Sequence, residues 1–291
     1  MIAEAAASAP LKVGPADHPL ARLLVRPNPE QTGVELLEAF YGHLQVSGNS
    51  YLEVASIDEA APSELYVLRP DRMSVLPGAD GWPVGWEHRV GANVRRFERD
   101  PLSGDAPILH VKLFHPADDW YGLSPMEAAA FSIDIHNAGG AWNKALIDNA
   151  ARPSGALVFT GAGGADRLSE EQFQRLKREL EDMHVGAANA GRPMLLEGGL
   201  EWRPMSLSPS DMDFIDARHA AARDIALAFG VPPMILGIPG DNTYSNYREA
   251  NLAFWRQTAL PLAQNAARAI EAWIGDRWPQ AGTAAVSVDE A

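Results

Sequence analysis

The sequence has no cysteine and no long apolar run, and both absences exclude classes of protein. Without cysteine, the 291 residues have no disulfide framework, no zinc-cysteine site and no thiol nucleophile. No segment approaches the roughly 18 to 20 uncharged apolar residues that cross a bilayer. The N-terminal "MIAEAAASAP" has neither the basic region nor the apolar core of a signal peptide. We therefore expect no membrane insertion and no secretion by that route.

Positive charge is also scarce, with 24 Lys and Arg against 38 Asp and Glu and a formal net charge of -14. Tight binding of nucleic acid comes mostly from Lys and Arg that displace counterions from phosphates. A chain with this balance can guide a duplex but is not expected to grip it. The largest local basic group is Arg89, Arg95, Arg96 and Arg99, which either contacts phosphate or, as its interleaved acids favour, forms the solvated side of a hairpin.

Motifs of phosphate and ester chemistry are missing as well. The glycine-rich "GAGGADRLS" lacks the Lys-Ser/Thr ending of a phosphate loop, and no G-x-S-x-G elbow occurs. Metal-ligand chemistry is concentrated in "HVKLFHPADDW", which holds His110, His115, Asp118 and Asp119. This spacing is not that of a helical histidine pair, and a turn whose aspartates accept backbone N–H groups explains it equally well. A metal-dependent hydrolase or nuclease stays an alternative hypothesis.

The apolar pattern of the first half predicts α+β structure with antiparallel strands. The 46% hydrophobic content is enough for a buried core. After Pro27, apolar residues recur at helical spacing until Gly48 and Asn49 break the pattern. Short strands rich in aromatic and β-branched residues follow, separated by Pro, Gly and Asp turns. The helical stripe consists of Leu36, Leu37, Phe40, Tyr41 and Leu44.

In the second half, apolar residues recur at the spacing of three long helices, and a small insert separates the first two. The first begins at Pro125 behind Ser124 and keeps an apolar stripe until Arg152-Pro153. The second begins near Ser208 to Ser210 and ends at Gly230, where Pro232 prevents continuation. The third is expected to be kinked or broken near Pro261. The two apolar stripes are Phe131, Ile135, Ala138, Trp142 and Ala145, then Met212, Ile215, His219, Ala222, Ala226 and Phe229.

The insert between the first two helices reads as a small α/β unit. The pattern predicts a strand in "SGALVFTG", then a helix, and then a hairpin in "RPMLLEGGLEWRPMSL". Ser169 and Gln172 have the spacing of a capping box. The predicted buried stripe of this helix is Phe173, Leu176, Leu180 and Met183.

In collinear order, several segments resemble the portal proteins of tailed double-stranded DNA phages of the Hong Kong 97 type, also found in prophages and gene transfer agents. The resemblance extends from about His18 to Trp278. The segments are "HPLARLLVRPNPEQTGVELLEAF", "GNSYLEV", "LYVLRPDRMSVLP", "LFHPADDWYGLSPMEAAAFSI", "SPSDMDFIDARHAAARDIALAFGVPPMILG" and "TYSNYREANLAFWRQTALPL".

The resemblance implies a ring, usually of twelve subunits, around a DNA channel at one capsid vertex. Family members normally have more chain before "HPLARLL" and a C-terminal crown, so a shortened chain without the crown, or a remnant that does not assemble, is a further alternative. The implied parts are a wing (1–122), stem helix 1 (123–153), a clip (154–208), stem helix 2 (209–230), a tunnel loop (231–244), and a wing helix with the C-terminal end (245–291).

The same resemblance implies partners and candidate residues but no catalytic, metal or cofactor site. Expected partners are further copies of the chain, double-stranded DNA without sequence preference, the terminase large subunit, the head-tail connector and the major capsid protein. The expected location is the virion, with assembly in the host cytoplasm. Candidates that face DNA are Met234, Ile235, Leu236, Ile238, Asn242 and Tyr244. Candidates for partner binding on the clip are Phe173, Arg175, Lys177, Arg178 and Trp202.

Overall fold

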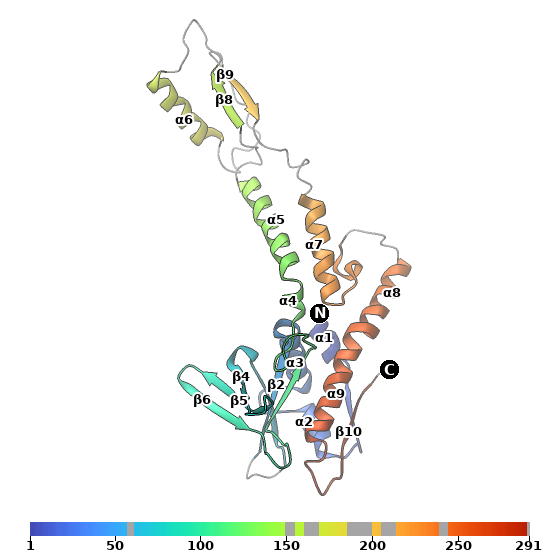
Figure 1. Ribbon diagram of the computed structural model, residues 1–291. Helices are drawn as coiled ribbons and strands as arrows, with labels where there is room; N and C mark the ends of the chain where they lie inside the picture. Colours follow the sequence, from blue (N-terminus) through green and yellow to red (C-terminus); the bar gives the residue numbers. More distant parts are fainter. Residues whose placement is uncertain are drawn as a thin grey trace. The chain divides into compact units, whose positions relative to one another are not determined.

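The computed structural model describes residues 1–56, 61–148, 155–159, 169–184, 200–204, 214–238 and 244–289 (Figure 1). The chain divides into two compact units. Unit 1 combines Met1–Ala130 with Arg223–Ala291, and unit 2 is Phe131–Ala222. Among the described helices, none has both the length and the apolar character that a membrane span requires.

Unit 1 contains most of the elements, and mixed helix and sheet is what the sequence predicts for it. In chain order its elements are α1 (Ile2–Ala7), β1 (Leu11–Gly14), α2 (Pro19–Val25), α3 (Gly33–Ser47), β2 (Asn49–Ala55), β3 (Glu64–Leu68), η1 (Pro70–Arg72), β4 (Met73–Pro77), β5 (Pro83–Val90), β6 (Asn93–Glu98), β7 (Ile108–Lys112), α4 (Pro125–Ala128), η4 (Pro233–Leu236), α8 (Tyr244–Phe254), η5 (Trp255–Ala259), α9 (Leu260–Ile274) and β10 (Ala285–Val288).

The strands of unit 1 pair antiparallel, which confirms the prediction for the first half of the chain. β2 lies between β3 and β7, and β5 lies between β4 and β6. Strands from near the two ends of the chain also pair, because β1 runs antiparallel to β10 with Leu11 opposite Val288. Helix α9 lies beside β10, and α3 lies beside β2 (Figure 1).

The main core of unit 1 forms where α3 packs with α1, α2 and α9 over β2 and β3. Helix α3 begins with a capping box, since Thr32 Oγ1 accepts the N–H of Glu35 and the Glu35 carboxylate accepts that of Thr32. It ends at Gly48, where φ is +73°. Each large apolar side chain that it buries contributes about 1.5 to 3 kcal/mol. The predicted stripe of Leu36, Leu37, Phe40, Tyr41 and Leu44 is buried throughout.

A second core joins the two three-stranded sheets. Aromatic and aliphatic side chains of the β4-β5-β6 sheet meet those of β2 and β7. This arrangement is expected of strands in which every second side chain faces the same side of the sheet. The buried members are Tyr51, Leu68, Met73, Val75, Trp86, Phe97, Ala106 and Ile108.

The predicted helix at Pro125 forms, but it is not one uninterrupted helix. Ser124 caps it as expected, because its Oγ accepts the N–H of Glu127 at 3.0 Å. Ala129 then leaves helical geometry with φ -90° and ψ 1°, and α5 (Ala130–Asp148) begins behind it. The spacing of apolar residues continues through this break, so the period alone does not reveal it.

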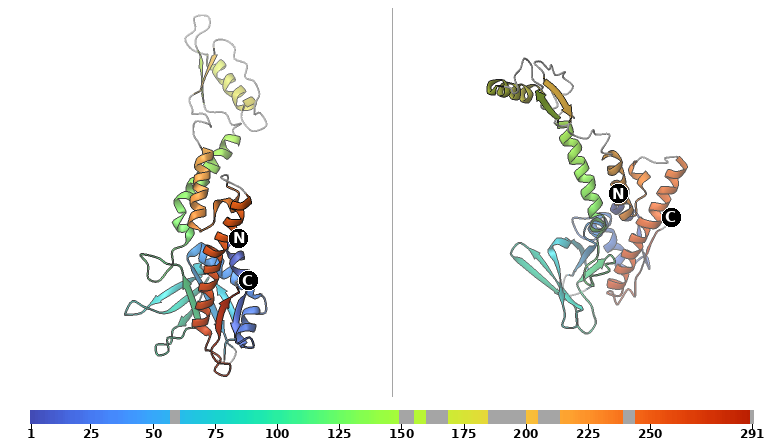
Figure 2. Two further views of the ribbon diagram at one scale, coloured as in Figure 1. Left: turned by 90° about the vertical axis from the view of Figure 1, so that its right-hand side faces the viewer. Right: turned by 45° about the horizontal axis from the view of Figure 1, so that its top comes forward.

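The third long helix is continuous across its proline, and it is the orange to red column in Figure 2. A π-helical turn, η5, replaces the predicted kink and joins α8 to α9 immediately before Pro261. The face of α9 toward the core carries small residues, which allow close packing against the neighbouring helices. Its buried residues are Ala263, Ala266, Ala267, Ile270 and Ile274.

Unit 2 contains most of α5, the paired strands β8 (Gly155–Phe159) and β9 (Leu200–Pro204), α6 (Glu170–His184), which lies between them in sequence, and the first part of α7 (Phe214–Ala228). The residues expected to pair with β9 in a hairpin, 192–199, lie outside the described residues. β8 and β9 are antiparallel. The predicted capping box of α6 is confirmed, since Gln172 N–H donates to Ser169 Oγ at 3.2 Å and Gln172 Oε1 accepts Ser169 N–H at 2.9 Å. Ser208 to Ser210 and Met212 lie outside the described residues.

One expectation about burial in unit 2 is wrong. Phe173 of α6 is 52% exposed, although its stripe was predicted to be buried. The apolar stripe of α5 is exposed, whereas that of α7 is exposed at Ile215 and half-buried or buried from His219 to Phe229. The exposed fractions are 78% for Phe131, 38% for Ile135, 45% for Trp142 and 66% for Ile215.

Candidate functional site

The upstream junction, where the chain passes from the sheets of unit 1 into α4, consists of Gly48, Asn49, His110 and Gly122. A Cβ on Gly122 would lie 2.1 Å from the carbonyl oxygen of Gly48, so the two backbones touch directly. Asn49 is 6% exposed, and its Oδ1 accepts the N–H of Gly122 at 2.8 Å. Gly48 also accepts the N–H of Leu113 at 2.8 Å. Buried hydrogen bonds and contacts without space for a methyl group make this junction rigid.

His110 completes the upstream junction as a neutral side chain. Its ring stacks on Tyr51 with centroids 4.2 Å apart and planes 20° apart. Burial, followed by the charge of Lys112, lowers the pKa of His110 to about 3. Its Nε2 lies 3.0 Å from Asn49 Oδ1, and because that oxygen also accepts the Gly122 N–H, His110 is the donor.

The other members of the proposed metal group hold one turn together. Oδ1 of Asp118 accepts the N–H groups of Trp120 at 2.7 Å and Tyr121 at 2.9 Å. Both bonds lower the pKa of the Asp118 carboxyl, and the bond from Tyr121 has the larger effect. Nδ1 of His115 accepts the N–H of Ala117 at 3.0 Å. Asp118 therefore stabilises a turn by accepting backbone N–H groups, which is the alternative to a metal ligand that the sequence predicts.

Asp119 takes part through its backbone carbonyl, which accepts a hydrogen bond from the Lys112 ammonium. His110 is committed to Asn49, so the four predicted ligands do not converge on a common point. Within the described ranges, no group of three or more His, Asp or Glu is placed to hold a metal ion. This geometry does not support a metal centre at His110, His115, Asp118 and Asp119, because His110 bonds to the distant Asn49 while His115 and Asp118 accept N–H groups of their own turn.

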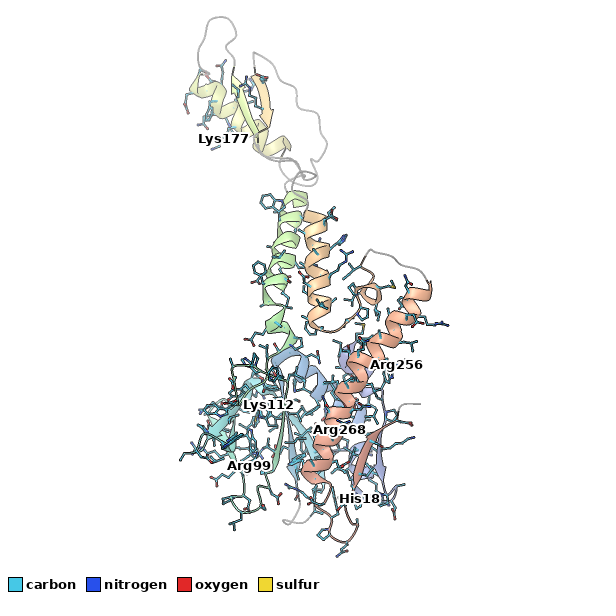
Figure 3. The ribbon with its side chains drawn as sticks, turned by 45° about the vertical axis from the view of Figure 1, so that its right-hand side comes forward. His18, Arg99, Lys112, Lys177, Arg256 and Arg268 are labelled. Carbon is cyan, nitrogen blue, oxygen red and sulfur yellow. The ribbon has the colours of Figure 1, made fainter. Side chains whose placement is uncertain are left out.

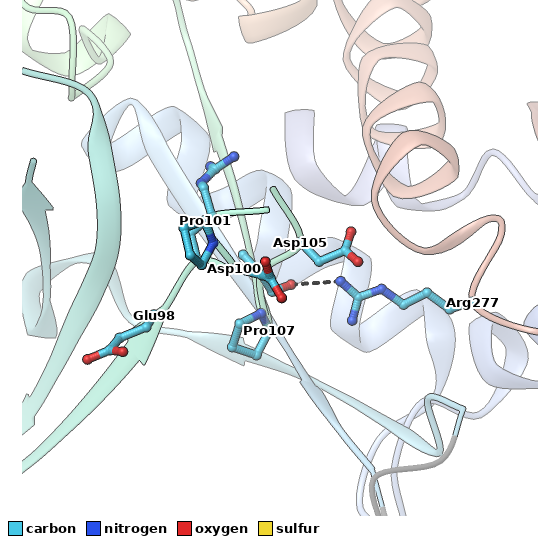
Figure 4. Close-up of a pocket in the computed structure, with 8 residues that line it drawn as sticks. Glu98, Asp100, Pro101, Asp105, Pro107 and Arg277 are labelled. Carbon is cyan, nitrogen blue, oxygen red and sulfur yellow. Dashed lines mark hydrogen bonds between the residues drawn. The ribbon is translucent and has the colours of Figure 1, made fainter. Parts of the chain in front are cut away.

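A surface pocket of about 390 Å³ lies between the loop after β6 and Arg277 (Figure 4). Of its acids, Asp100 stabilises the loop that carries it. Backbone N–H groups of Ser103 and Leu102 donate to Asp100 and lower its pKa. Arg277 Nη2 donates to the Ala106 carbonyl at 3.0 Å. The groups around this pocket are therefore used in holding the loop onto the end of α9.

The four arginines of the β5-β6 region are the solvated and paired side of a hairpin, as the interleaved acids favoured. Exposed ion pairs of this kind contribute little to stability, about 0 to 1 kcal/mol each. In these pairs, the guanidinium groups that could bind a phosphate already have partners. The partners are Glu87 for Arg89 and Arg96, Glu53 for Arg95, and the face of the Trp86 ring for Arg99.

The downstream junction, where α7 ends in unit 1, consists of Gly230, Val231 and Thr258. Gly230 has φ +65°, and its N–H donates to Leu227 O at 3.0 Å. Val231 N–H donates to Ala226 O at 2.8 Å, and this bond completes a Schellman motif. Val231 itself is buried, with 4% of its surface exposed. Thr258 Oγ1 donates to the Gly230 carbonyl at 2.6 Å. Gly230 therefore ends the helix as the sequence predicts.

The segment after this junction is compact. The 3-10 turn η4 ends at Gly237, whose φ is +72°. Leu236 is 48% exposed, while Met234, Ile235 and Ile238 are half-buried. Asn242 and the side chain of Tyr244 lie outside the described residues, although Tyr244 begins α8. The described loop candidates thus lie together on one short turn with apolar atoms at the surface.

The candidates for partner binding in unit 2 lie on α6 and β9. Phe173, Arg175, Lys177 and Arg178 share the exposed first part of α6, and Figure 3 labels Lys177 there. Trp202 is in β9, and its side chain lies outside the described residues.

Three residues of the two junctions were not identified from the sequence. Asn49 was noted only as a helix breaker, and Gly122 and Thr258 were not singled out. Their partners are distant in sequence: 73 residues separate Asn49 from Gly122, and 28 separate Thr258 from Gly230. The proline at 261 was the available signal for Thr258, because a helix widens next to a proline.

The chain matches the family described as phage portal protein over residues 1–290. It belongs to the phage portal protein family. An uncharacterized protein of Rickettsia bellii is 44% identical over 259 residues, which are 89% of this chain and 66% of that protein. The chain therefore spans about two thirds of the length of that relative.

Solved structures agree with this assignment. A chain in the neck of a native gene transfer agent particle, computed with C12 symmetry, is 53% identical with a TM-score of 0.75, covering 100% of this chain and 79% of that one. A Hong Kong 97 family portal protein of Corynebacterium diphtheriae has a TM-score of 0.66 at 17% identity, covering 99% and 88% of the two chains. At that identity the second likeness shows the fold alone. The mixed helix and sheet expected from the resemblance is confirmed.

Proposed function

We propose that this chain is a ring-forming portal subunit that lines a passage for double-stranded DNA at a particle vertex. Unit 2 then corresponds to the clip with most of stem helix 1 and the beginning of stem helix 2. Unit 1 corresponds to the wing, the tunnel loop and the end of stem helix 2. Family membership supports the role, and the similar neck chain belongs to a particle computed with C12 symmetry.

The structural observation that carries the proposal is the exposed apolar stripe of α5. Phe131 is 78% exposed and Trp142 is 45% exposed, on a helix whose apolar residues recur every three or four positions. A helix buries such a face against another element. In a ring, heterologous contacts repeated between copies bury the same face in every subunit. We assign the stripe to the contact with the neighbouring subunit.

A pair of phenylalanines tests this contact. Phe131→Asp places a charge in the proposed interface and should weaken ring association roughly tenfold or more, since buried aromatic residues carry much of the energy of an interface. Phe114→Asp is the control, because Phe114 is 85% exposed but lies outside α5. Native mass spectrometry measures the fraction of rings. Equal ring fractions for both variants would contradict the assignment of α5.

The charge of the chain fits a conduit. Duplex DNA carries one charge per about 1.7 Å of axis, so a strongly basic channel would bind it and oppose movement. The net charge of -14 and the exposed Asp216 and Asp224 of α7 reduce such binding. The apolar η4 turn then offers passing DNA a surface without full charges. We propose no catalytic role for the portal.

Replacing Ile235 and Ile238 together by Asp tests the loop. The double variant should fold, because both side chains are half-buried on a surface turn, yet package or retain less DNA in particles. Leu102→Asp combined with Phe114→Asp is the matched control, adding the same two charges at positions 97% and 85% exposed. DNA content per particle is the measurement. Normal content in the loop variant would remove residues 231–238 from the DNA path.

The remaining partners follow from the same proposal. The first part of α6, with Phe173 exposed next to Arg175, Lys177 and Arg178, would contact the terminase large subunit during packaging and the head-tail connector afterwards. The wing would contact the major capsid protein. Charge reversal at Lys177 and Arg178 should reduce terminase binding while rings still form, which a pull-down with purified terminase measures.

A further inference from the structure

Thr258 lies in the π-helical turn η5, next to the exposed Arg256 that Figure 3 labels. In this turn the N–H of Leu260 donates to the carbonyl of Trp255, five residues back. Pro261 follows, and a proline has no N–H to give and crowds the carbonyl four residues before it. A widened turn relieves that crowding, and such turns often mark functional positions. The proline therefore explains why the helix is irregular at this point.

The widened turn directs Thr258 toward another element. A threonine inside a helix commonly donates to a carbonyl of the preceding turn. Thr258 instead donates to Gly230 O at 2.6 Å, across to the end of α7. A Cβ on Gly230 would lie 2.8 Å from Thr258 Oγ1, and the φ of +65° disfavours any other residue there. The glycine and the threonine thus fit each other.

The backbone bonds of the following turn are local. They join residues of the segment 232–238 only to one another, so they fix its shape but not its place. The bonds run from Ile235 N to Pro232 O, from Gly237 N to Met234 O and from Ile238 N to Pro233 O. Thr258 ties the start of this segment to a separate long helix.

We propose that Thr258 is a positioning residue for the loop: the π-helical turn directs its hydroxyl at Gly230 and thereby sets where residues 231–238 begin. Release of this contact lets the loop move while the Schellman end of α7 stays formed. The proposal rests on the proposed function only in assigning DNA to the loop. The contact itself is tested without DNA.

Hydrogen exchange on the assembled protein provides the test. Thr258→Val keeps the shape of the side chain and removes its hydroxyl, whereas Thr258→Ser keeps the hydroxyl. Since one net hydrogen bond corresponds to about a fivefold equilibrium factor, amides of residues 231–238 should exchange about fivefold faster in the valine variant. The serine variant should match the parent. Amides of α9 should be unchanged in both variants, which excludes general destabilisation.

A double-mutant cycle with Gly230→Ala tests whether Thr258 acts through its contact with Gly230. Gly230→Ala displaces Thr258, so adding Thr258→Val to it should change loop exchange less than twofold, a non-additive result expected of groups in contact. Unchanged loop exchange in Thr258→Val, or equal acceleration by Val and Ser, overturns the proposal. Faster exchange with normal DNA retention in particles confirms the role of Thr258 and instead contradicts the assignment of DNA to this loop.

Discussion

The two junctions of unit 1 are built differently. At the upstream junction, two glycine backbones touch and a buried Asn49 accepts hydrogen bonds from Gly122 and His110. At the downstream junction, the end of α7 is attached by the Thr258 hydroxyl at the surface. A buried polar group that loses its partner costs far more than an exposed one, which water can satisfy. The hydrogen bonds to side chains therefore hold the start of α4 more firmly than they hold the carbonyl of Gly230, although Val231 beside that glycine is buried.

This difference suits a conduit in which one part must bear load and another must yield. Under the proposed function, the rigid upstream junction would support the start of α4. For a loop that is proposed to lie beside moving DNA, a contact that opens at low cost is an advantage.

Gly122→Ala should have the largest effect. The added Cβ would lie 2.1 Å from Gly48 O and 2.6 Å from Leu113 N, both backbone atoms. Overpacking of this kind costs about 3 kcal/mol of unfolding free energy. Urea denaturation measures it. Gly42→Ala is the control, since nothing lies within 4 Å of its Cβ and α3 continues through it. If Gly122→Ala loses no more unfolding free energy than Gly42→Ala, the backbone at this junction can shift to accept a Cβ.

Asn49→Ala should have the next largest effect. It leaves the buried N–H of Gly122 and the ring N–H of His110 without their acceptor. An unsatisfied buried group costs about 1 to 3 kcal/mol, so we expect a loss of about 2 kcal/mol by the same denaturation method. Unchanged stability would indicate that water replaces the side chain and that the junction is less dry than its burial suggests.

The upstream junction should also be sensitive to acid. A histidine in an unfolded chain has a pKa near 6.5, whereas burial lowers that of His110 to about 3. The unfolded state thus binds the proton first. The contribution of His110 is complete above about pH 6.5 and is lost as the pH falls toward 3. His110→Phe, which keeps the stacking on Tyr51, should flatten this dependence in urea midpoints measured at pH 7 and pH 5. An equal decline in both proteins would contradict it.

Gly230→Ala should have the smallest effect on global stability. Its left-handed backbone costs a non-glycine residue about 1 kcal/mol, and the nearest atoms belong to the side chain of Thr258 and not to the backbone. Thermal unfolding should shift only slightly. A loss as large as that of Gly122→Ala would remove the contrast between the two junctions.

The sequence predicts those features that depend on neighbours along the chain. The capping box at Ser169, the buried stripe from Leu36 to Leu44 and the end of α7 at Gly230 all follow from local chemistry. The break at Ala129 and the exposure of Phe131 do not, because an apolar period says that a face is to be covered but not by what. Contacts such as Thr258 with Gly230 depend on folding that brings distant segments together.

Native mass spectrometry of the whole chain, over a range of concentrations, tests the central claim most directly. A portal subunit should form closed rings, with twelve copies as in the C12 symmetry of the similar neck. The ring fraction should fall in Phe131→Asp and stay constant in Phe114→Asp. A chain that remains monomeric at high concentration would contradict function as a portal and favour a remnant that does not assemble.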